Sequence, residues 1–469
     1  MTHAYPDNRF LRGNFAPLRL ECDAPDLVIE GELPRELDGT LLRNGPNPYY
    51  PPRDDYHMFS GDGMVHAFRL RDGRVSYRNR WVRTDKLNRE VAAGRALFGT
   101  FGNPATSEPE VRGLRYNVAN TNVLFHGGRL LALEEFNPPF ELDAATLASR
   151  GPCDFDGRLR GPMTAHPKVD ALTGALHAFG YCVDGWGSTR MAYHHIDAAG
   201  VLTRTVEFDA PYCAMVHDFI VTERYLVFPI FPLTIEPQRA RRGGPLLAWE
   251  QDRPSLLGVM PREGSAADLR WFAGEACCVF HPLNAYDVDG VIVADMLRYD
   301  AGPGFPHADG RPPDPRQAEA RLERWRLDLH GATDSFTTTR LDEQASEFPR
   351  LDERYAGRAH RYGYFSTTPG AQGRAAVFDE IARYDFARDT REVYRLPAGD
   401  SVSEPVFVPR HADAPEGEGW LLAVAHRARE ARSDLLVLDA AHIAAGPVAL
   451  ARLETRVPSG FHGNWMPAA

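Results

Sequence analysis

The sequence predicts an all-β fold built from many short strands. Runs of apolar and β-branched residues alternate with glycine, proline and aspartate along the 469 residues, which is typical of strands joined by tight turns. The 41 glycines and 37 prolines are spread over the chain rather than gathered in one linker, and this favours a single domain over residues 1–469. A weak internal repeat adds a third indication, because radial repetition is the mark of a β-propeller.

The predicted strands are the runs with the most apolar residues. They cover 129–136, 175–183, 224–231, 291–296 and 419–426. The repeat joins residues 142–148, which read LDAATLA, to residues 438–444, which read LDAAHIA. An aspartate and small residues after a strand suit the outer strand of a blade as it turns toward the next blade. Turn chemistry that arose twice independently is the alternative explanation.

Helical patterns are scarce. We expect helices only at 89–98, 315–323 and 378–387, where alanine, glutamate and arginine are frequent. These short helices are expected to cap a β scaffold.

The composition is that of an ordinary folded protein, with 43% hydrophobic and 25% charged residues. The net charge is −11 and the lysines and arginines are dispersed, which argues against a nucleic-acid partner. The start of the chain has no apolar leader, and no window approaches the roughly 18 apolar residues of a membrane span. We therefore expect a cytoplasmic protein, with at most peripheral membrane contact and a small apolar ligand.

Six cysteines form no CxxC pair and no regular framework, so they are expected to be reduced and mostly buried. Cys213 lies only four residues before His217. A catalytic thiol there is the alternative to a packing role, and we favour packing.

Four histidines occupy comparable positions at or after the ends of predicted strands: His166, His217, His281 and His462. They are too far apart in the chain for any local motif, so only a closed, many-stranded scaffold would join them. Imidazole is a ligand for Zn, Cu, Fe or Ni. Since the chain has 17 histidines, a structural role for each is the competing interpretation, and spacing alone does not favour a metal site. We assign such structural roles to His57, His66, His126, His177, His194, His195, His360 and His426.

Three glutamates with apolar neighbours are candidates to support such a site. Four neutral imidazoles leave the charge of a divalent ion uncompensated, so carboxylates that accept the outward N–H groups of the ligands are expected. Glu135, Glu347 and Glu404 lie in strand-like segments, where an unpaired carboxylate would be costly.

Seven segments, taken in order, resemble the carotenoid cleavage oxygenase family over nearly the whole chain. The segments are 39–48, 59–66, 164–168, 216–219, 280–286, 403–409 and 461–465. The resemblance implies a seven-bladed β-propeller that holds a non-haem Fe(II) with the four histidines. It also implies that Glu135, Glu347 and Glu404 accept hydrogen bonds from those ligands.

The family's reaction is the cleavage of a conjugated carbon–carbon double bond with O₂, which gives two carbonyl products without an organic cofactor. The resemblance further implies that Thr121 lies near an open coordination position. The bacterial branch that cleaves lignostilbene and isoeugenol is the most similar. That branch usually has a tyrosine where Phe101 stands and a lysine where Glu134 stands, and this pair binds a phenol oxygen.

These two replacements leave three substrate classes open: a neutral aryl alkene, a phenol that donates to Glu134, or an apocarotenoid. Phe59, Phe101 and Phe305 are expected to form apolar walls of the pocket, with a core role as the alternative for each. Two further functions are weighed. A non-catalytic ligand-binding propeller is disfavoured because all four histidines and all three glutamates are present. A metal hydrolase is disfavoured because the motifs contain no carboxylate ligand or general base.

Overall fold

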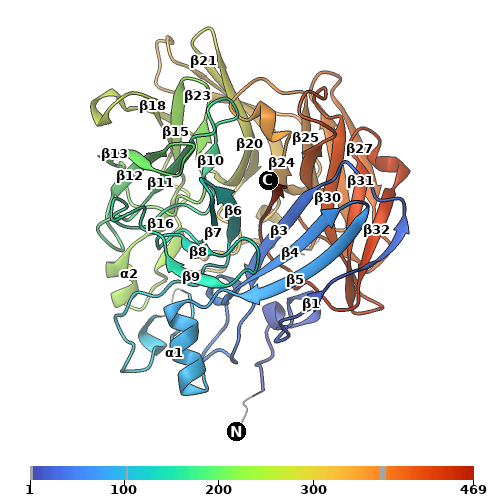
Figure 1. Cartoon of the computed structure of the whole chain (residues 1–469). Coiled ribbons are helices and arrows are strands. Elements are labelled where there is room, and N and C mark those ends of the chain that lie inside the picture. The colour runs from blue at the N-terminus through green and yellow to red at the C-terminus, as the bar shows by residue number, and fades with distance from the viewer. Residues whose placement is uncertain (1–3, 102–103, 369–376, 469) are drawn as a thin grey trace. The chain divides into compact units, whose positions relative to one another are not determined.

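The computed structural model describes residues 4–101, 104–368 and 377–468, and divides the chain into two compact units. The terminal unit comprises Met1–Leu159 and Leu396–Ala469, and the central unit comprises Arg160–Arg395. Strands dominate both (Figure 1). None of the helices in the described ranges has the length and apolarity that crossing a membrane requires.

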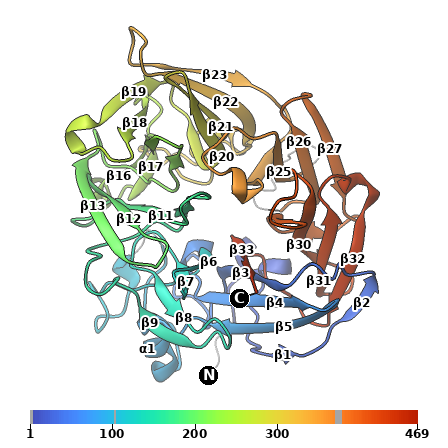
Figure 2. The same ribbon diagram turned by 45° about the horizontal axis from the view of Figure 1, so that its top comes forward.

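The central unit contains four antiparallel sheets of four strands each among its described residues. Each sheet uses strands that follow one another in the chain, and Figure 2 shows the sheets in sequence order from green to orange. The first two are β10 (Lys168–Val169), β11 (Leu176–Gly180), β12 (Arg190–Ile196), β13 (Leu202–Asp209); and β14 (Ile220–Val221), β15 (Tyr225–Ile230), β18 (Ser255–Pro261), β19 (Arg270–Gly274). The other two are β20 (Cys278–Val288), β21 (Val291–Tyr299), β22 (Arg321–Asp328), β23 (Phe336–Arg340); and β24 (Ser346–Arg350), β25 (Tyr362–Thr367), β26 (Glu380–Asp385), β27 (Thr390–Arg395). A separate hairpin joins β16 (Leu233–Ile235) to β17 (Leu247–Trp249).

The terminal unit contains three antiparallel sheets in the part of the chain that is described. One follows the chain: β6 (Asn122–His126), β7 (Arg129–Leu133), β8 (Phe140–Leu142), β9 (Ser149–Pro152). The second has the order β1 (Asp23–Ala24), β5 (Arg74–Trp81), β4 (Gly63–Arg71), β3 (Gly39–Pro46), β33 (Gly463–Pro467). The third has the order β2 (Val28–Gly31), β32 (Pro447–Leu453), β31 (Arg432–Asp439), β30 (Gly419–Arg427), β28 (Ser401–Val402), with β29 (Val406–Pro409) also paired to β30. Four sheets in one unit and three in the other match the blade count of the predicted seven-bladed propeller.

All five strands predicted above are confirmed, as β7, β11, β15, β21 and β30. The helix predicted at 89–98 is present as α1 (Asp85–Ala93), which the Thr84 hydroxyl caps and Gly94 ends. The helix α2 (Pro237–Arg241), which begins with a proline, was not predicted. The remaining turns are 3₁₀ helices at Arg9–Leu11, Gly13–Phe15, Met58–Ser60, Pro104–Thr106, Ala266–Asp268, Pro315–Gln317, Glu353–Tyr355 and Ile443–Ala445.

Two predicted helices are wrong. Residues 315–323 form a 3₁₀ turn that leads into β22, and residues 378–387 contain β26. Each of these strands pairs on both sides, β22 with β21 and β23, and β26 with β25 and β27. Those two rows of backbone hydrogen bonds override the local helix preference of alanine, glutamate and arginine, which is a weak signal.

The terminal unit joins strands from both ends of the sequence in one sheet. β33 pairs with β3, so that Arg43 lies opposite Gly463. A Cβ atom on Gly463 would lie 2.2 Å from the carbonyl oxygen of Leu42. Only glycine therefore lets the last strand approach β3 this closely.

We expect Gly463→Ala to lower the free energy of unfolding by at least about 2 kcal/mol, since the new methyl group meets backbone that cannot move alone. Denaturant titration followed by circular dichroism measures this. Gly113→Ala is the control, because its Cβ meets nothing within 4 Å and only its positive φ of 82° opposes the change. Equal effects of the two substitutions would contradict the close-packing argument.

Candidate metal centre and its surroundings

Three predicted ligands converge in the central unit. The Nε2 atoms of His166 and His217 are 3.0 Å apart, and those of His217 and His281 are 3.3 Å apart. Two nitrogens bound at ~2.1 Å to one ion at a right angle would be separated by about 3 Å. This spacing therefore fits imidazoles that share a metal ion.

Each of these histidines lies on, or directly before, the first strand of a different sheet. His166 precedes β10, His217 precedes β14, and His281 lies within β20. The register of β20 against β21 is interrupted between Val279 and Pro282. An interruption of this kind turns a side chain out of the regular alternation. The same position in successive sheets thus supplies one ligand after another.

Backbone contacts fix the segment that carries His166. The N–H of Thr164 donates to the carbonyl of Phe179 on β11, and the Thr164 hydroxyl accepts from the N–H of His166 at 2.9 Å. The His166 segment is therefore held to the sheet that follows it.

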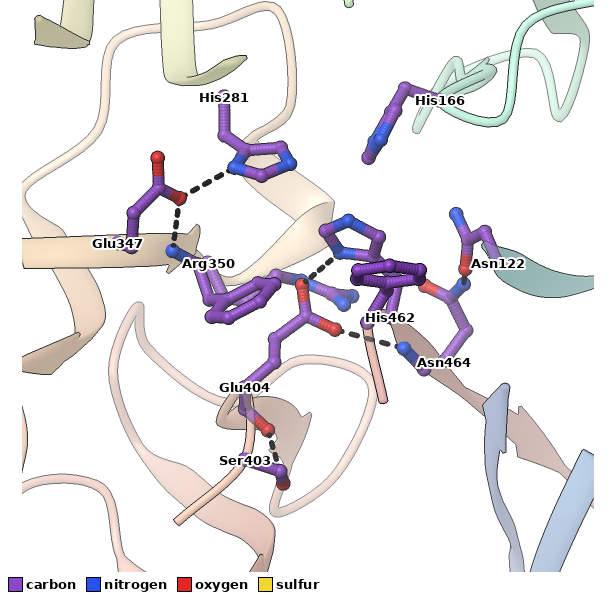
Figure 3. Close-up of polar contacts among 12 residues, drawn as sticks. Asn122, His166, His281, Glu347, Arg350, Ser403, Glu404, His462 and Asn464 are labelled. Atoms are coloured by element: carbon purple, nitrogen blue, oxygen red, sulfur yellow. Dashed lines mark hydrogen bonds and ion pairs between the residues drawn. The ribbon is translucent and has the colours of Figure 1, made fainter. Parts of the chain in front are cut away.

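Glu347 lies against the ring of His281. Its Oε2 lies 2.5 Å from Nδ1 of His281 (Figure 3), and it also accepts from the N–H of Phe348 at 2.8 Å. The hydroxyl of Tyr299 donates to the other oxygen at 2.6 Å. A carboxylate that accepts from Nδ1 places the proton there and leaves Nε2 with the lone pair that a metal needs. The sequence analysis does not predict Tyr299, because no motif around this tyrosine indicates that its hydroxyl contacts Glu347.

The pKa of Glu347 depends on burial and on its hydrogen-bond donors, which act in opposite directions. Burial alone raises the pKa of this carboxyl, but His281, the Tyr299 hydroxyl and the Phe348 N–H outweigh burial and hold the pKa below its ordinary value. Glu347 is therefore an anion inside the protein, which helps to offset the charge of a bound cation.

Asp218 is a second carboxylate beside the ligands that sequence reasoning missed. It is buried, and it pairs with Lys168 at 2.8 Å. Its oxygen lies 3.8 Å from Nδ1 of His166, which is too far for a hydrogen bond. Lys168 and Asp218 are each the near neighbour of a ligand in the chain, and this proximity is the signal that could have identified them.

The terminal unit holds the fourth predicted ligand in the same way. Nδ1 of His462 lies 3.0 Å from Oε1 of Glu404 (Figure 3), while Oε2 accepts from the N–H of Gly463 at 2.9 Å. The backbone N–H of His462 donates to the carbonyl of Thr121 at 3.1 Å, and its carbonyl accepts from the N–H of Asn44. Thr121 thus adjoins His462. As in His281, Nε2 is the ring nitrogen that is available to coordinate a metal.

A buried arginine that was not predicted accompanies Glu404. Arg43 is 3% exposed, and its Nη2 donates to the carbonyl of Phe461 at 3.3 Å. Burial lowers the pKa of Arg43 to about 10, while the nearby Glu404 carboxylate opposes this shift. Arg43 remains a cation and balances the charge of Glu404 in the interior.

Half-buried aromatic rings gather in the terminal unit. Phe59 contacts Phe101, Phe461 and His57 at centroid distances of 5.3, 5.8 and 4.5 Å. Phe101 also contacts Phe136 at 6.2 Å. Phe461 directly precedes the predicted ligand His462. The aromatic cluster, defined as Phe59, Phe101, Phe136, Phe461 and His57, therefore adjoins this residue.

His57 belongs to this cluster, although it was assigned a purely structural role. Its Nδ1 accepts from the N–H of Phe59 at 3.3 Å. Burial, with a smaller effect of Arg9, lowers the pKa of His57 to about 4. His57 is therefore a neutral ring at pH 7 and forms part of an uncharged surface.

Phe305 belongs to the central unit. It is buried in the loop between β21 and β22, next to Pro306, whose carbonyl accepts from the N–H of Trp249. Its role as a pocket wall stays a prediction.

Comparisons with known proteins bear on this site. The family model described as retinal pigment epithelial membrane protein matches residues 15–467. The chain belongs to this family. It is 39% identical to an isoeugenol monooxygenase from Pseudomonas putida, over 97% of each chain. It is 38% identical to the lignostilbene-alpha,beta-dioxygenase isozyme III of Sphingomonas paucimobilis, over 100% of this chain and 99% of that relative.

Solved structures agree with the family assignment. The crystal structure of a lignostilbene dioxygenase from Pseudomonas brassicacearum superposes with a TM-score of 0.95 at 37% identity, over 99% of this chain and all of that chain. The cobalt-substituted apocarotenoid oxygenase of Synechocystis gives a TM-score of 0.85 at 29% identity, over 96% and 97%. The predicted family, enzyme class and seven-bladed propeller are confirmed.

Glu134 stands where the resemblance described above implies a lysine. It directly follows β7, is 5% exposed, and accepts from the N–H of Phe136 at 2.8 Å and from the side-chain amide of Asn137. Its neighbour Glu135 is also buried. Burial raises the pKa of Glu134 to about 7. The two hydrogen bonds lower this pKa, and the nearby Glu135 raises it further.

The raised pKa of Glu134 predicts a pH-dependent loss of stability. Between its ordinary pKa of 4.5 and about 7, the unfolded chain has lost this proton while the folded protein keeps it, so stability falls as the pH rises through this window. From about pH 5 to about pH 7.5, we expect the free energy of unfolding to fall by about 2 kcal/mol more in the unchanged protein than in Glu134→Gln. Denaturant titrations at four pH values measure this difference.

Glu110→Gln, at an exposed carboxylate, is the control and should follow the unchanged protein. Parallel pH profiles for Glu134→Gln and the unchanged protein would show that Glu134 is ionised in both states.

Proposed function

We propose that this protein is a non-haem Fe(II) oxygenase that cleaves the conjugated double bond of an aryl alkene with O₂ and releases two carbonyl products. The convergence of three Nε2 atoms in the central unit carries this proposal. The relatives named isoeugenol monooxygenase and lignostilbene dioxygenase support it, at 38–39% identity over almost the full chain.

The proposed ligands of the iron are His166, His217, His281 and His462. Imidazole suits ferrous iron, and the hydrogen bonds of Glu347 and Glu404 leave Nε2 of two of these rings unprotonated. We assign Glu135 the same task toward a third ring. When bound by these four rings, an iron ion would supply the redox chemistry that lets O₂ react with an alkene.

The aromatic cluster is the proposed binding site of the substrate. Phe59, Phe101 and Phe461 offer ring faces and edges for an aryl group, and stacked or edge-to-face contacts hold a planar substrate in a fixed orientation. Orientation beside the ligands is the main contribution that these residues make to the rate. We assign Thr121, whose carbonyl accepts from the N–H of His462, a place near an open coordination position of the iron.

Glu134 is the proposed contact for a phenol. Its two oxygens accept one hydrogen bond each within the protein, and a carboxylate oxygen can accept a second bond. A substrate hydroxyl would then donate to Glu134. The resemblance implies a tyrosine and a lysine that bind the substrate oxygen at the positions of Phe101 and Glu134, so the proposed hydrogen bond would run in the opposite direction here.

A panel of alkenes tests the function. We expect the iron-loaded protein in air to convert isoeugenol, 4-vinylguaiacol or resveratrol into aromatic aldehydes, which mass spectrometry identifies, and His166→Ala to produce none. Shortening of an apocarotenal alone would assign the protein to the carotenoid-cleaving members. Bound iron without turnover of any alkene would reject the proposed substrates.

The proposed hydrogen bond from a substrate phenol to Glu134 is tested by comparing phenolic substrates with their methoxy analogues. At about pH 8.5, above the raised pKa of Glu134, a hydrogen bond to this charged acceptor contributes about 1.5–3 kcal/mol, so Glu134→Gln should lower kcat/KM for the phenols by about 10- to 100-fold. The 4-methoxy analogues cannot donate, and their kcat/KM should change little. Equal losses for both sets would show that Glu134 acts only on the fold.

Metal affinity tests the glutamates separately from turnover. Loss of a carboxylate partner of a ligand weakens metal binding by about 10- to 100-fold, so Glu347→Gln and Glu404→Gln should each bind Fe(II) or Co(II) that much more weakly in calorimetric titrations. Glu353→Gln removes an exposed carboxylate of the same type and should leave the affinity unchanged. Unchanged affinity in the first two variants would exclude a role in holding the ligands.

A further inference from the structure

Two cysteines of the central unit lie in direct contact. The sulfur atoms of Cys182 and Cys213 are 3.5 Å apart, although the residues are 31 positions apart in the chain. Cys182 lies in the turn after β11 and is buried, whereas Cys213 is half-buried. The pair has no part in the proposed ligand set or the aromatic cluster.

The backbone at Cys182 has a conformation that is uncommon for residues other than glycine. Cys182 has φ = 50°, in the left-handed region that glycine normally occupies. Its carbonyl accepts from the N–H of Gly185, and the N–H of Val183 donates to the carbonyl of Arg190. Such strain persists where the surrounding structure requires the side chain, and here the side chain reaches Cys213.

The surroundings of Cys213 favour its thiolate. Its sulfur accepts hydrogen bonds from the Cys182 thiol and from the N–H of Gly187, and these bonds lower the pKa of Cys213 although burial opposes them. The pKa values of Cys22, Cys153, Cys277 and Cys278 are raised by burial. Cys213 is thus the cysteine best suited to react, and Cys182 is in position to respond.

We propose that Cys182 and Cys213 are a redox-reactive dithiol that closes to an intramolecular disulfide when the protein meets a low-molecular-weight disulfide. The Cys213 thiolate attacks one sulfur of glutathione disulfide, which forms a mixed disulfide and releases one glutathione thiolate. The Cys182 thiol then loses its proton and attacks the Cys213 sulfur, which forms the protein disulfide and releases the second glutathione. The two cysteines are oxidised by two electrons, and one glutathione disulfide is reduced to two thiols.

The bridge would join two segments that carry ligands. Phe179, three residues before Cys182, accepts from Thr164 and so holds the His166 segment. Cys213 is followed by Ala214, which pairs with Thr234, and then by His217. A disulfide between them would brace both segments, and a reducing cytosol would open it again, as expected of a transient redox-sensing bridge.

Thiol mapping tests the proposal. The full-length protein is incubated with glutathione disulfide, remaining thiols are alkylated, and peptides are identified by mass spectrometry. We expect loss of the two thiols in a peptide pair joined through Cys182 and Cys213, reversed by reduced glutathione. We expect amide hydrogen exchange around residues 182–190 and 213–217 to slow in the oxidised protein.

Three variants make the test specific. Cys182→Ser should stop at the mixed disulfide on Cys213, and Cys213→Ser should lose thiols at least about tenfold more slowly. Cys153→Ser removes a buried thiol outside the pair and should close the bridge like the unchanged protein. A bridge between other cysteines, or no bridge while Cys213 carries glutathione, would overturn the proposal. Free thiols on both Cys182 and Cys213 after the incubation would overturn it as well.

Discussion

A strand inside a sheet must pair its backbone N–H groups, and a proline has no N–H to offer. The site of this protein depends on that constraint. Proline directly follows His166, His281 and Glu404, and it comes two residues after Glu347. In β20 and β24 the register breaks at these prolines. Each break lies on the first strand of its sheet, which pairs on one side only, and edge strands are where a sheet tolerates proline.

The interrupted strands explain how a regular β scaffold presents polar side chains. In an unbroken strand, side chains point alternately to the two faces of the sheet. A histidine on a face that packs against the neighbouring sheet would then be buried among apolar groups. A break releases one residue from this alternation without unpairing the rest of the strand. The break in β20 places His281, whereas His166 and His217 lie in the segments that lead into β10 and β14. The ligand atoms of these three histidines lie within 4.8 Å of one another.

Buried charge is the second theme. Glu347 is held ionised by donors on three sides, and Glu404 lies near the buried cation Arg43. Such groups add little to stability as isolated pairs, since desolvation opposes their attraction. Their value lies in the tautomer and position that they impose on His281 and His462. Glu134 has no such cation among its hydrogen-bond partners, and its burial raises its pKa.

Local sequence predicted the strands well and the helices poorly. Alternating and apolar runs identified β7, β11, β15, β21 and β30. In these strands the order of apolar and polar residues shows directly whether one or both faces are buried. The segments of β22 and β26 have helical composition, and only pairing with two neighbouring strands makes them extended. Tyr299, Asp218 and Arg43 escaped prediction for a similar reason, since their partners are distant in the chain.

The sequence by itself determined the all-β class, the family resemblance, the histidines and the glutamates, because residue type and motif order carry that information directly. The tertiary structure decided which groups meet. Glu347 meets His281, Glu404 meets His462, and Cys182 meets Cys213. These contacts join residues 31 to 66 positions apart. Such contacts depend on how strands pair and turn, which no single segment specifies.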